Sequence, residues 1–216
     1  NIKTFSEGQM KKVFEIGGID TSGKTEQINA VLSLLQKRGL AVGVASKRLP
    51  LDERFPKDFS QRVDWYHNAP VEEIILANLE STVRRDELTF KMDKDIVLED
   101  RGFITIYSSC VAHCMQRTGK GLKESCLFVD KLNQEGGYFS IENAHFLLEF
   151  QNPLTMNEVI KKRSPEIVSD IFGKYLGFMD EAIRKQRDSG VIYRLNAEDS
   201  IKNTSEYIMH TIQGLI

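Results

Sequence analysis

The sequence predicts an α/β fold in which a five-stranded parallel sheet is flanked by helices in three layers. Short apolar segments alternate with longer segments of helical periodicity, an alternation typical of βαβ units. The apolar segments are almost continuously hydrophobic, as expected of strands that helices cover on both faces. The chain has 216 residues without a repeat or a low-complexity linker, so we expect one domain over residues 1–216.

Glycine and proline positions set the boundaries of the predicted elements. The first predicted helix stops at Gly39, and Pro70, Pro153 and Pro165 each suit the first turn of a helix. The predicted strands are 13–16, 40–45, 96–98, 146–150 and 191–195. The predicted helices are 28–39, 70–88, 104–116, 123–134, 153–163, 165–188 and 200–213. Residues 48–68 mix Pro, Phe, Asp and Trp, which predicts a loop or short irregular structure.

Charge and composition exclude several classes of protein. The 29 basic and 31 acidic residues give a net charge of -2, which argues against a general nucleic-acid-binding protein. No apolar run reaches the length of about 18 residues that a membrane span needs. The three cysteines form no disulfide framework, and the first residues contain no apolar signal core. We therefore expect a cytoplasmic protein without a membrane or nucleic-acid partner. The four histidines lack metal-ligand spacing, so we expect each to be structural or exposed.

The segment from Gly18 to Thr25 reads GIDTSGKT and fits the phosphate-loop pattern G-x-x-x-x-G-K-[ST]. A predicted strand enters it and a predicted helix leaves it, as the mechanism requires. Backbone N–H groups of such a loop surround phosphate oxygens, while Lys24 would reach the β- and γ-phosphates and the Thr25 hydroxyl would bind Mg²⁺. The sequence therefore predicts ATP and Mg²⁺ as ligands. The predicted ATP-binding residues are Gly18, Asp20, Thr21, Ser22, Gly23, Lys24, Thr25 and Glu26.

A second motif lies where the apolar segment 96–98 runs into Glu99, Asp100 and Arg101. A carboxylate at the end of a strand beside a phosphate loop can hold Mg²⁺ or orient an acceptor hydroxyl. Successive side chains of an extended chain point in opposite directions, so we expect one of the two carboxylates to face the site. Arg101 can bind a phosphate through two parallel hydrogen bonds. A solvated turn is the alternative interpretation of these three residues.

Together these segments resemble the thymidylate kinase family of P-loop nucleoside monophosphate kinases, in order and over most of the chain. The segment 14–27 is similar to that family's phosphate loop, including Asp20. Residues 48–50 (RLP) resemble its Arg-Glu-Pro element, and Asp100-Arg101 resembles its Asp-Arg-aromatic element, with Gly102 at the aromatic position. Segments 108–109 and 119–122 resemble the helix and glycine-rich stretch that follow, and 152–163 the helix before the lid.

The resemblance implies ATP-dependent phosphoryl transfer to a nucleoside monophosphate, normally dTMP, giving dTDP. It implies a short lid at about residues 161–175. It also implies a homodimer. By this analogy the catalytic residues are Lys24, Asp100, Arg101 and Arg163, the acceptor-binding residues are Asp20, Arg48, Arg84 and Arg101, and the metal ligands are Thr25 and Asp100.

The acceptor side departs from the family pattern. Leu76 and Glu80 stand where the family has a Phe for the base and an Arg for the acceptor phosphate, and Arg84 and Arg85 follow one turn later. Gly17 stands where a Glu is usual. Three alternatives therefore stay open: a kinase of a nucleoside or another small hydroxyl acceptor, a nucleotide-dependent switch or ATPase, and a degenerate homologue that binds nucleotide without transferring phosphate. A switch that used GTP would normally carry an Asn-Lys-x-Asp signature, and the sequence has none.

Overall fold

The computed structural model describes residues 11–46, 53–163, 170–186 and 190–216. The strands are β1 (Lys12–Gly18), β2 (Val42–Ser46), β3 (Ile96–Asp100), β4 (Ala144–Glu149) and β5 (Ile192–Asn196). The helices are α1 (Lys24–Lys37), α2 (Phe59–Asn68), α3 (Val71–Lys91), α4 (Phe103–Thr118), α5 (Leu122–Gly136), α6 (Pro153–Arg163), α7 (Asp170–Lys185) and α8 (Ile201–Leu215).

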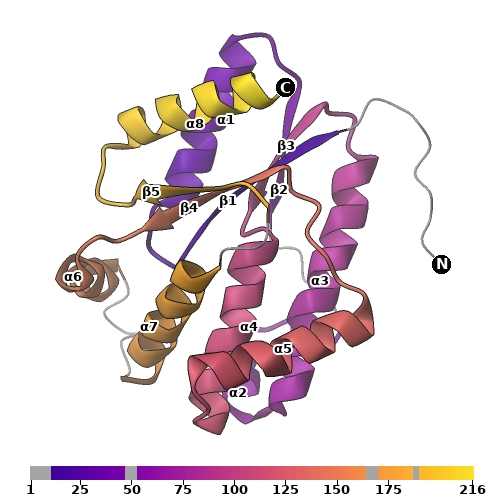
Figure 1. Ribbon diagram of the computed structural model, residues 1–216, viewed down its shortest axis with the longest axis vertical. Coiled ribbons are helices and arrows are strands. Elements are labelled where there is room, and N and C mark those ends of the chain that lie inside the picture. The colour runs from indigo at the N-terminus through magenta and orange to yellow at the C-terminus, as the bar shows by residue number, and fades with distance from the viewer. Residues whose placement is uncertain (1–10, 47–52, 164–169, 187–189) are drawn as a thin grey trace.

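The strands pair in the order β2-β3-β1-β4-β5, and every pairing is parallel. Helices cover both faces, with α1 and α8 on one face and α3, α4, α5 and α7 on the other (Figure 1). The predicted fold class, an α/β protein with a five-stranded parallel sheet flanked by helices, is therefore confirmed. Within the described ranges, no helix is both long and apolar enough to cross a membrane.

Burial explains why the strands are hydrophobic on both sides. Phe14, Leu98 and Phe146 of the three central strands pack with Val31 of α1 and Ile208 of α8 in one core cluster. On the other face α4 is the central helix, and each of its residues from 103 to 115 is buried. A helix that is buried all round needs no polar face, so its buried polar residues, such as Thr105, Ser109 and His113, find partners inside the protein.

One predicted element is wrong. The segment 48–68 was expected to be a loop, but the structure has helix α2 at Phe59–Asn68. Aromatic packing holds this helix: the ring centroids of Trp65 and Tyr66 are 5.1 Å apart, and Phe55 lies 5.1 Å from Trp65. Tyr66 also stacks on His113 of α4, and these contacts together outweigh the weak local propensity of the segment. The second strand also begins two residues later than expected, at Val42.

The sheet order places the two predicted motifs side by side. β3 is hydrogen-bonded to β1 in a register that sets Glu15 opposite Glu99 and Ile16 opposite Asp100. The carboxyl ends of parallel strands lie at one edge of the sheet, so the loop after β1 and the acidic end of β3 share that edge. Ligands of open α/β sheets bind in the crevice outside this edge.

Candidate functional site

The loop between β1 and α1 contains backbone conformations that glycine adopts more readily than other residues. Gly18 has φ 135° and Gly23 has φ 86°, in the region that favours glycine. A Cβ on Gly18 would lie 2.5 Å from the carbonyl oxygen of Leu148, so a larger residue would overlap the backbone of β4. Thr21 has φ 75°. A left-handed conformation costs such a residue about 1–2 kcal/mol, and strain of this kind gathers at functional sites.

Lys24 begins α1, and its ammonium lies over the loop rather than in solvent. The side chain is 6% exposed, and Nζ donates to the carbonyl oxygen of Ile19 at 2.5 Å. Burial, and after it the nearby Arg101 guanidinium, lower the pKa of Lys24 to about 8, although Asp20 and Asp100 act in the opposite direction. A buried ammonium that is only partly compensated favours an anionic ligand. Lys24 is thus placed to bind a phosphate.

Unsatisfied oxygen atoms surround the loop. Thr21 Oγ1, Ser22 Oγ and Asp100 Oδ1 are all buried, and none has a hydrogen-bond partner among the described residues. Buried polar atoms are almost always hydrogen-bonded, so a group of exceptions indicates a ligand site. Mg²⁺ takes carboxylate and hydroxyl oxygens as ligands. The Asp100 carboxylate and the hydroxyl of Thr25, which is exposed in the first turn of α1, therefore fit the predicted metal site.

Arg101 connects the acidic strand end to the loop. Its guanidinium pairs with the Asp20 carboxylate, and its main-chain N–H donates to the carbonyl oxygen of Ile16 at 3.4 Å. Arg101 has φ 65°; in the part of the chain that the structure describes, it and Thr21 are the two non-glycine residues with positive φ. Both strained residues lie at the same edge of the sheet, so the fold maintains an unfavourable backbone on each side of the site.

A wall of aromatic side chains stands beside Arg101. Tyr66 of α2 stacks on His113 of α4 with centroids 4.8 Å apart and planes 5° apart, and His113 lies 4.6 Å from Tyr175 of α7. The Tyr175 hydroxyl is 2.7 Å from the Ser109 hydroxyl. Burial raises the pKa of Tyr66 to about 12 and also raises that of Tyr175, so both remain neutral at physiological pH. Tyr66 also lies 5.1 Å from Trp65 and Tyr175 lies 6.0 Å from Phe172, so the rings pack on one another and border the site as a neutral, mostly apolar wall.

Not every predicted residue joins this arrangement. Asp20, Lys24, Asp100 and Arg101 come together, whereas the side chains of Glu26 and Arg84 are exposed on α1 and α3. Arg48, the side chain of Arg163 and residues 164–169 of the predicted lid lie outside the described residues. Lys161 and Lys162 are exposed near the end of α6, consistent with either a lid or a solvated face.

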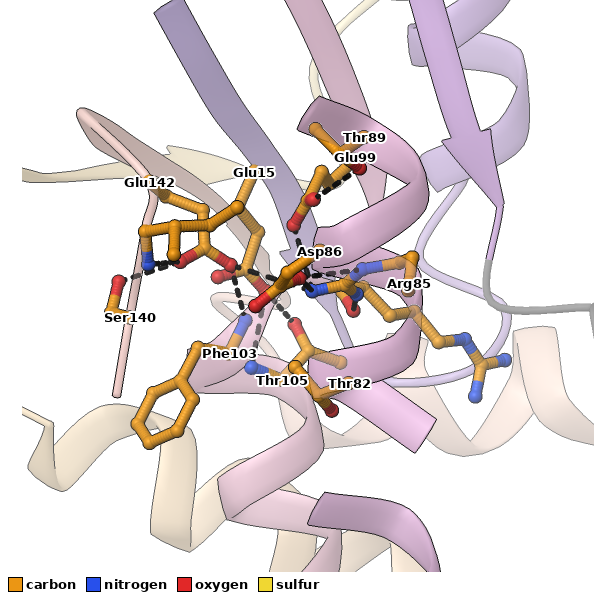
Figure 2. Close-up of polar contacts among 12 residues, drawn as sticks. Glu15, Thr82, Arg85, Asp86, Thr89, Glu99, Phe103, Thr105, Ser140 and Glu142 are labelled. Carbon is orange, nitrogen blue, oxygen red and sulfur yellow. Dashed lines mark hydrogen bonds and ion pairs between the residues drawn. The ribbon is translucent and has the colours of Figure 1, made fainter. Parts of the chain in front are cut away.

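Arg85, next to Arg84 in α3, is instead the centre of a buried polar network (Figure 2). It is 3% exposed, and its Nη2 lies 2.9 Å from Asp86 Oδ1 and 2.8 Å from Glu99 Oε2. Glu142, before β4, lies 3.8 Å from the same nitrogen. Burial raises the pKa of Glu99 and raises that of Asp86 to about 7, because Arg85 offsets only part of the cost of several buried carboxylates. Glu99 therefore turns into the network while Asp100 remains at the loop, as strand alternation predicts.

Two carboxylates of this network cap the start of α4, whose N-cap residue, Gly102, has no side chain. Glu142 accepts from the N–H of Phe103 at 2.6 Å, and Glu15 of β1 accepts from the N–H of Thr105 at 3.1 Å. His145 Nδ1 lies 2.7 Å from the other Glu15 oxygen. Carboxylates at a helix N-terminus satisfy free N–H groups and are stabilised by the helix dipole.

Glu15, Glu142 and His145 also have ligand atoms within 4.8 Å of one another. Their carboxylates already accept main-chain and hydroxyl donors, so the positive end of α4 supplies the charge that a cation would bring. His145 is buried and pairs with Glu15, which agrees with the structural role expected for the histidines.

The network explains two departures of this sequence from the pattern that it resembles. A Cβ on Gly17 would lie 2.5 Å from Glu15 Oε1, and a Cβ on Gly102 would lie 2.7 Å from the Cβ of Glu15. Side chains at either position would displace the carboxylate that caps α4. The glutamate at position 15 can therefore cap α4 only because positions 17 and 102 are glycine.

Comparison with protein-family models finds no model that matches the chain, and comparison with curated protein sequences finds no match. The site thus rests on its own geometry: a glycine loop, a buried lysine, an unsatisfied aspartate and an arginine across from it. The sequence placed Tyr175 at the end of the predicted lid, whereas it lies in α7 beside His113; the placement of both residues beside the site was missed. The signal for such a wall was the pair Trp65-Tyr66, which lies in the segment 48–68 that the sequence predicts to be a loop or short irregular structure.

Proposed function

We propose that this protein transfers the γ-phosphoryl group of ATP to a nucleoside monophosphate, with dTMP, giving dTDP, as the acceptor that the resemblance singles out. The observation that carries the proposal is the meeting of Lys24 and Asp100 at one edge of the sheet. The buried ammonium of Lys24 opens α1 directly after the glycine loop, and the unsatisfied carboxylate oxygen of Asp100 ends β3, the neighbour of the strand that leads into that loop. This combination suits a magnesium-bound polyphosphate.

On the donor side, the loop's main-chain N–H groups and the N-terminus of α1 bind the β- and γ-phosphate oxygens. Lys24 moves from the carbonyl of Ile19 to those oxygens and offsets the charge that spreads over the γ-phosphoryl group. Thr25 and Asp100 would hold Mg²⁺, which when bound supplies further charge neutralisation at the phosphates. The protein's task in such a transfer is positioning and electrostatic stabilisation.

On the acceptor side, Arg101 lies between Asp20 and the aromatic wall. Its guanidinium can exchange the Asp20 carboxylate for a phosphate of the acceptor, because both groups accept two parallel hydrogen bonds from an arginine. Asp20 then becomes available to the acceptor's sugar hydroxyl. The neutral side chains of Tyr66 and Tyr175, which pack on His113, would border the acceptor's base.

A second candidate is transfer to an unphosphorylated nucleoside or another small hydroxyl compound. Arg85 favours it: the family's α3 arginine binds the acceptor phosphate, whereas Arg85 is enclosed by Asp86 and Glu99 and Arg84 is exposed. In this case Asp100 or Asp20 would accept the hydroxyl proton.

One assay separates the candidates. Purified protein is given ATP and Mg²⁺ with each of a panel of nucleosides and nucleoside monophosphates, and ADP release is measured. The proposal expects ADP release that a monophosphate accelerates and the matching nucleoside does not. Acceleration by nucleosides would select the second candidate, and slow ADP release that no acceptor changes would overturn both in favour of an ATPase or switch.

A further inference from the structure

The buried polar network around Arg85 has two ends that reach the candidate site. Most of its hydrogen bonds join β1, β3, α3 and α4 to one another and explain only how these elements pack. Two further bonds leave the network and end on residues of the site itself, one at the phosphate loop and one at the turn after β3. Each of these two bonds ties the main chain of a site residue to the network.

The first bond runs through Thr105 of α4. Its hydroxyl donates to Glu15 Oε1 at 2.5 Å and accepts from the main-chain N–H of Gly18 at 3.2 Å. Gly18 is the first glycine of the phosphate loop, and its φ of 135° sets the direction in which the loop leaves β1. Glu15 is itself fixed by the N–H groups of α4 and by His145. Thr105 therefore holds the start of the loop at a defined distance from α4.

The second bond runs through Arg85. Its Nη1 donates to the carbonyl oxygen of Arg101 at 2.6 Å, while Nη2 is held between Asp86 and Glu99. Arg101 adopts the left-handed conformation, φ 65°, which an arginine takes only where its surroundings impose it. The bond from Arg85 fixes the peptide that follows this residue, and so fixes the direction of the Arg101 side chain toward Asp20.

We infer that this network is the positioning framework of the transfer site, in which Thr105 aligns the phosphate loop for the donor and Arg85 aligns Arg101 for the acceptor. The inference rests on the proposed function and adds two positioning residues that touch neither substrate. We call the bond from Thr105 to Gly18 the donor arm and the bond from Arg85 to Arg101 the acceptor arm. The two arms leave the same buried network and end on residues that contact different substrates. Damage to one arm therefore impairs one substrate and leaves the other.

The test compares Thr105→Val, Thr105→Ser and Arg85→Lys with the wild type. Valine matches threonine in shape but removes both bonds of the hydroxyl, whereas serine retains the hydroxyl. Lysine retains the charge of Arg85 but cannot span Asp86, Glu99 and the Arg101 carbonyl with one nitrogen. Thr204→Val, a buried threonine of α8 on the opposite face of the sheet, controls for loss of a buried hydroxyl.

For each variant, KM for ATP, KM for the acceptor, kcat and the melting temperature are measured. We expect Thr105→Val to raise KM for ATP on the order of tenfold or more and Arg85→Lys to raise KM for the acceptor or lower kcat to a similar extent. Thr105→Ser should restore KM for ATP, and Thr204→Val should lower the melting temperature without a change in either KM.

Two results would overturn the inference. One is that both arms' variants lower the melting temperature but leave both KM values at the wild-type level, as a structural network would. The other is that Thr105→Val and Arg85→Lys change the same KM by the same factor. A wild type that transfers no phosphate to any acceptor contradicts the proposed function instead. In that case the dissociation constant for ATP with Mg²⁺, measured by calorimetry, tests the donor arm: equal values for Thr105→Val and the wild type would reject it.

Discussion

At the residue scale, the candidate site consists of a few residues whose burial or backbone conformation does not stabilise the folded protein. Lys24 is buried with a lowered pKa, Asp100 keeps an unsatisfied oxygen, and Thr21 and Arg101 have left-handed backbones. Each of these features costs free energy in the protein alone. A phosphate and a divalent cation would offset the first two costs, so the residues that look unfavourable are the residues that a magnesium-bound nucleotide would satisfy.

Replacing Lys24 tests this view directly. We expect Lys24→Ala to lower the transfer rate by at least about a hundredfold, because it removes a donor aimed at developing charge. Its melting temperature should stay within a few degrees of the wild type, since a partly compensated buried charge is lost. The exposed Lys37→Ala, in the last turn of the same helix, is the control and should transfer at the wild-type rate. Near-normal turnover of Lys24→Ala would reject the assignment of the loop.

At the element scale, the start of α4 is fixed by carboxylates from other elements instead of by its own cap. Glu15 comes from β1 and Glu142 from the segment before β4, and together they accept from three main-chain N–H groups of the first turn. The absence of a side chain at Gly102 is what admits them. The helix that carries Thr105, Ser109 and His113 is therefore placed relative to the sheet by buried charge, which ties the site to the core.

Replacing Gly102 tests, through protein stability, whether the carboxylates pack this closely at the start of α4. We expect Gly102→Ala to lower the free energy of unfolding by about 1–3 kcal/mol, because the new Cβ would lie 2.7 Å from the Cβ of Glu15. Gly177→Ala in α7 meets no atom within 4 Å and should raise it by roughly 0.5–1 kcal/mol. Urea unfolding measures both. An alanine at position 102 that proves as harmless as the one at 177 would contradict the close packing.

The network also predicts a pH dependence of stability. Burial raises the pKa of Asp86 from 3.8 to about 7, so in that interval the folded state binds more protons than the unfolded state. Stability from this group is present at acidic pH and is lost as the pH rises toward 7. Between pH 4 and 7 we expect the free energy of unfolding to fall less steeply with pH for Asp86→Asn than for the wild type. The two slopes should differ by up to about 1.4 kcal/mol per pH unit.

Urea titrations at several pH values measure these slopes. Asp93→Asn, at an exposed position after α3, should keep the slope of the wild type. Equal slopes for Asp86→Asn and the wild type would show that Asp86 loses its proton as readily in the folded chain as in the unfolded one.

At the scale of the whole molecule, the strand order explains how distant motifs make one site. The loop after β1 and the acidic end of β3 are some 75 residues apart in sequence yet adjacent in the sheet. The fold class and the strand–loop–helix around residues 18–25 could be predicted because both are local: apolar runs mark strands, and the pattern GIDTSGKT spans 8 residues between a strand and a helix.

The rest of the site could not be predicted because it depends on long-range contacts. Glu15 and His145 are separated by 130 positions, and Tyr175 approaches Ser109 across 66. Neither pairing corresponds to a sequence pattern that could be recognised without the structure. Helix α2 was missed because its aromatic residues are poor local evidence for a helix, and the stacking of Tyr66 on His113 of α4 joins residues far apart in the sequence. Arg84 was preferred to Arg85 for the acceptor, and only the rotation of α3 distinguishes the exposed position from the buried one.

The central claim is that residues 18–25, with Lys24, bind the triphosphate of a magnesium-bound nucleotide. The most direct test is the melting temperature of the whole chain, without and with ATP and Mg²⁺ at a concentration far above the dissociation constant. Binding to the folded state alone at a hundredfold excess adds about 2.7 kcal/mol, which for a chain of this size raises the melting temperature by roughly 5–10 °C. We predict that rise for the wild type and its loss in Lys24→Ala. An equal melting temperature with and without ATP in the wild type, or an equal rise in both proteins, would contradict the claim.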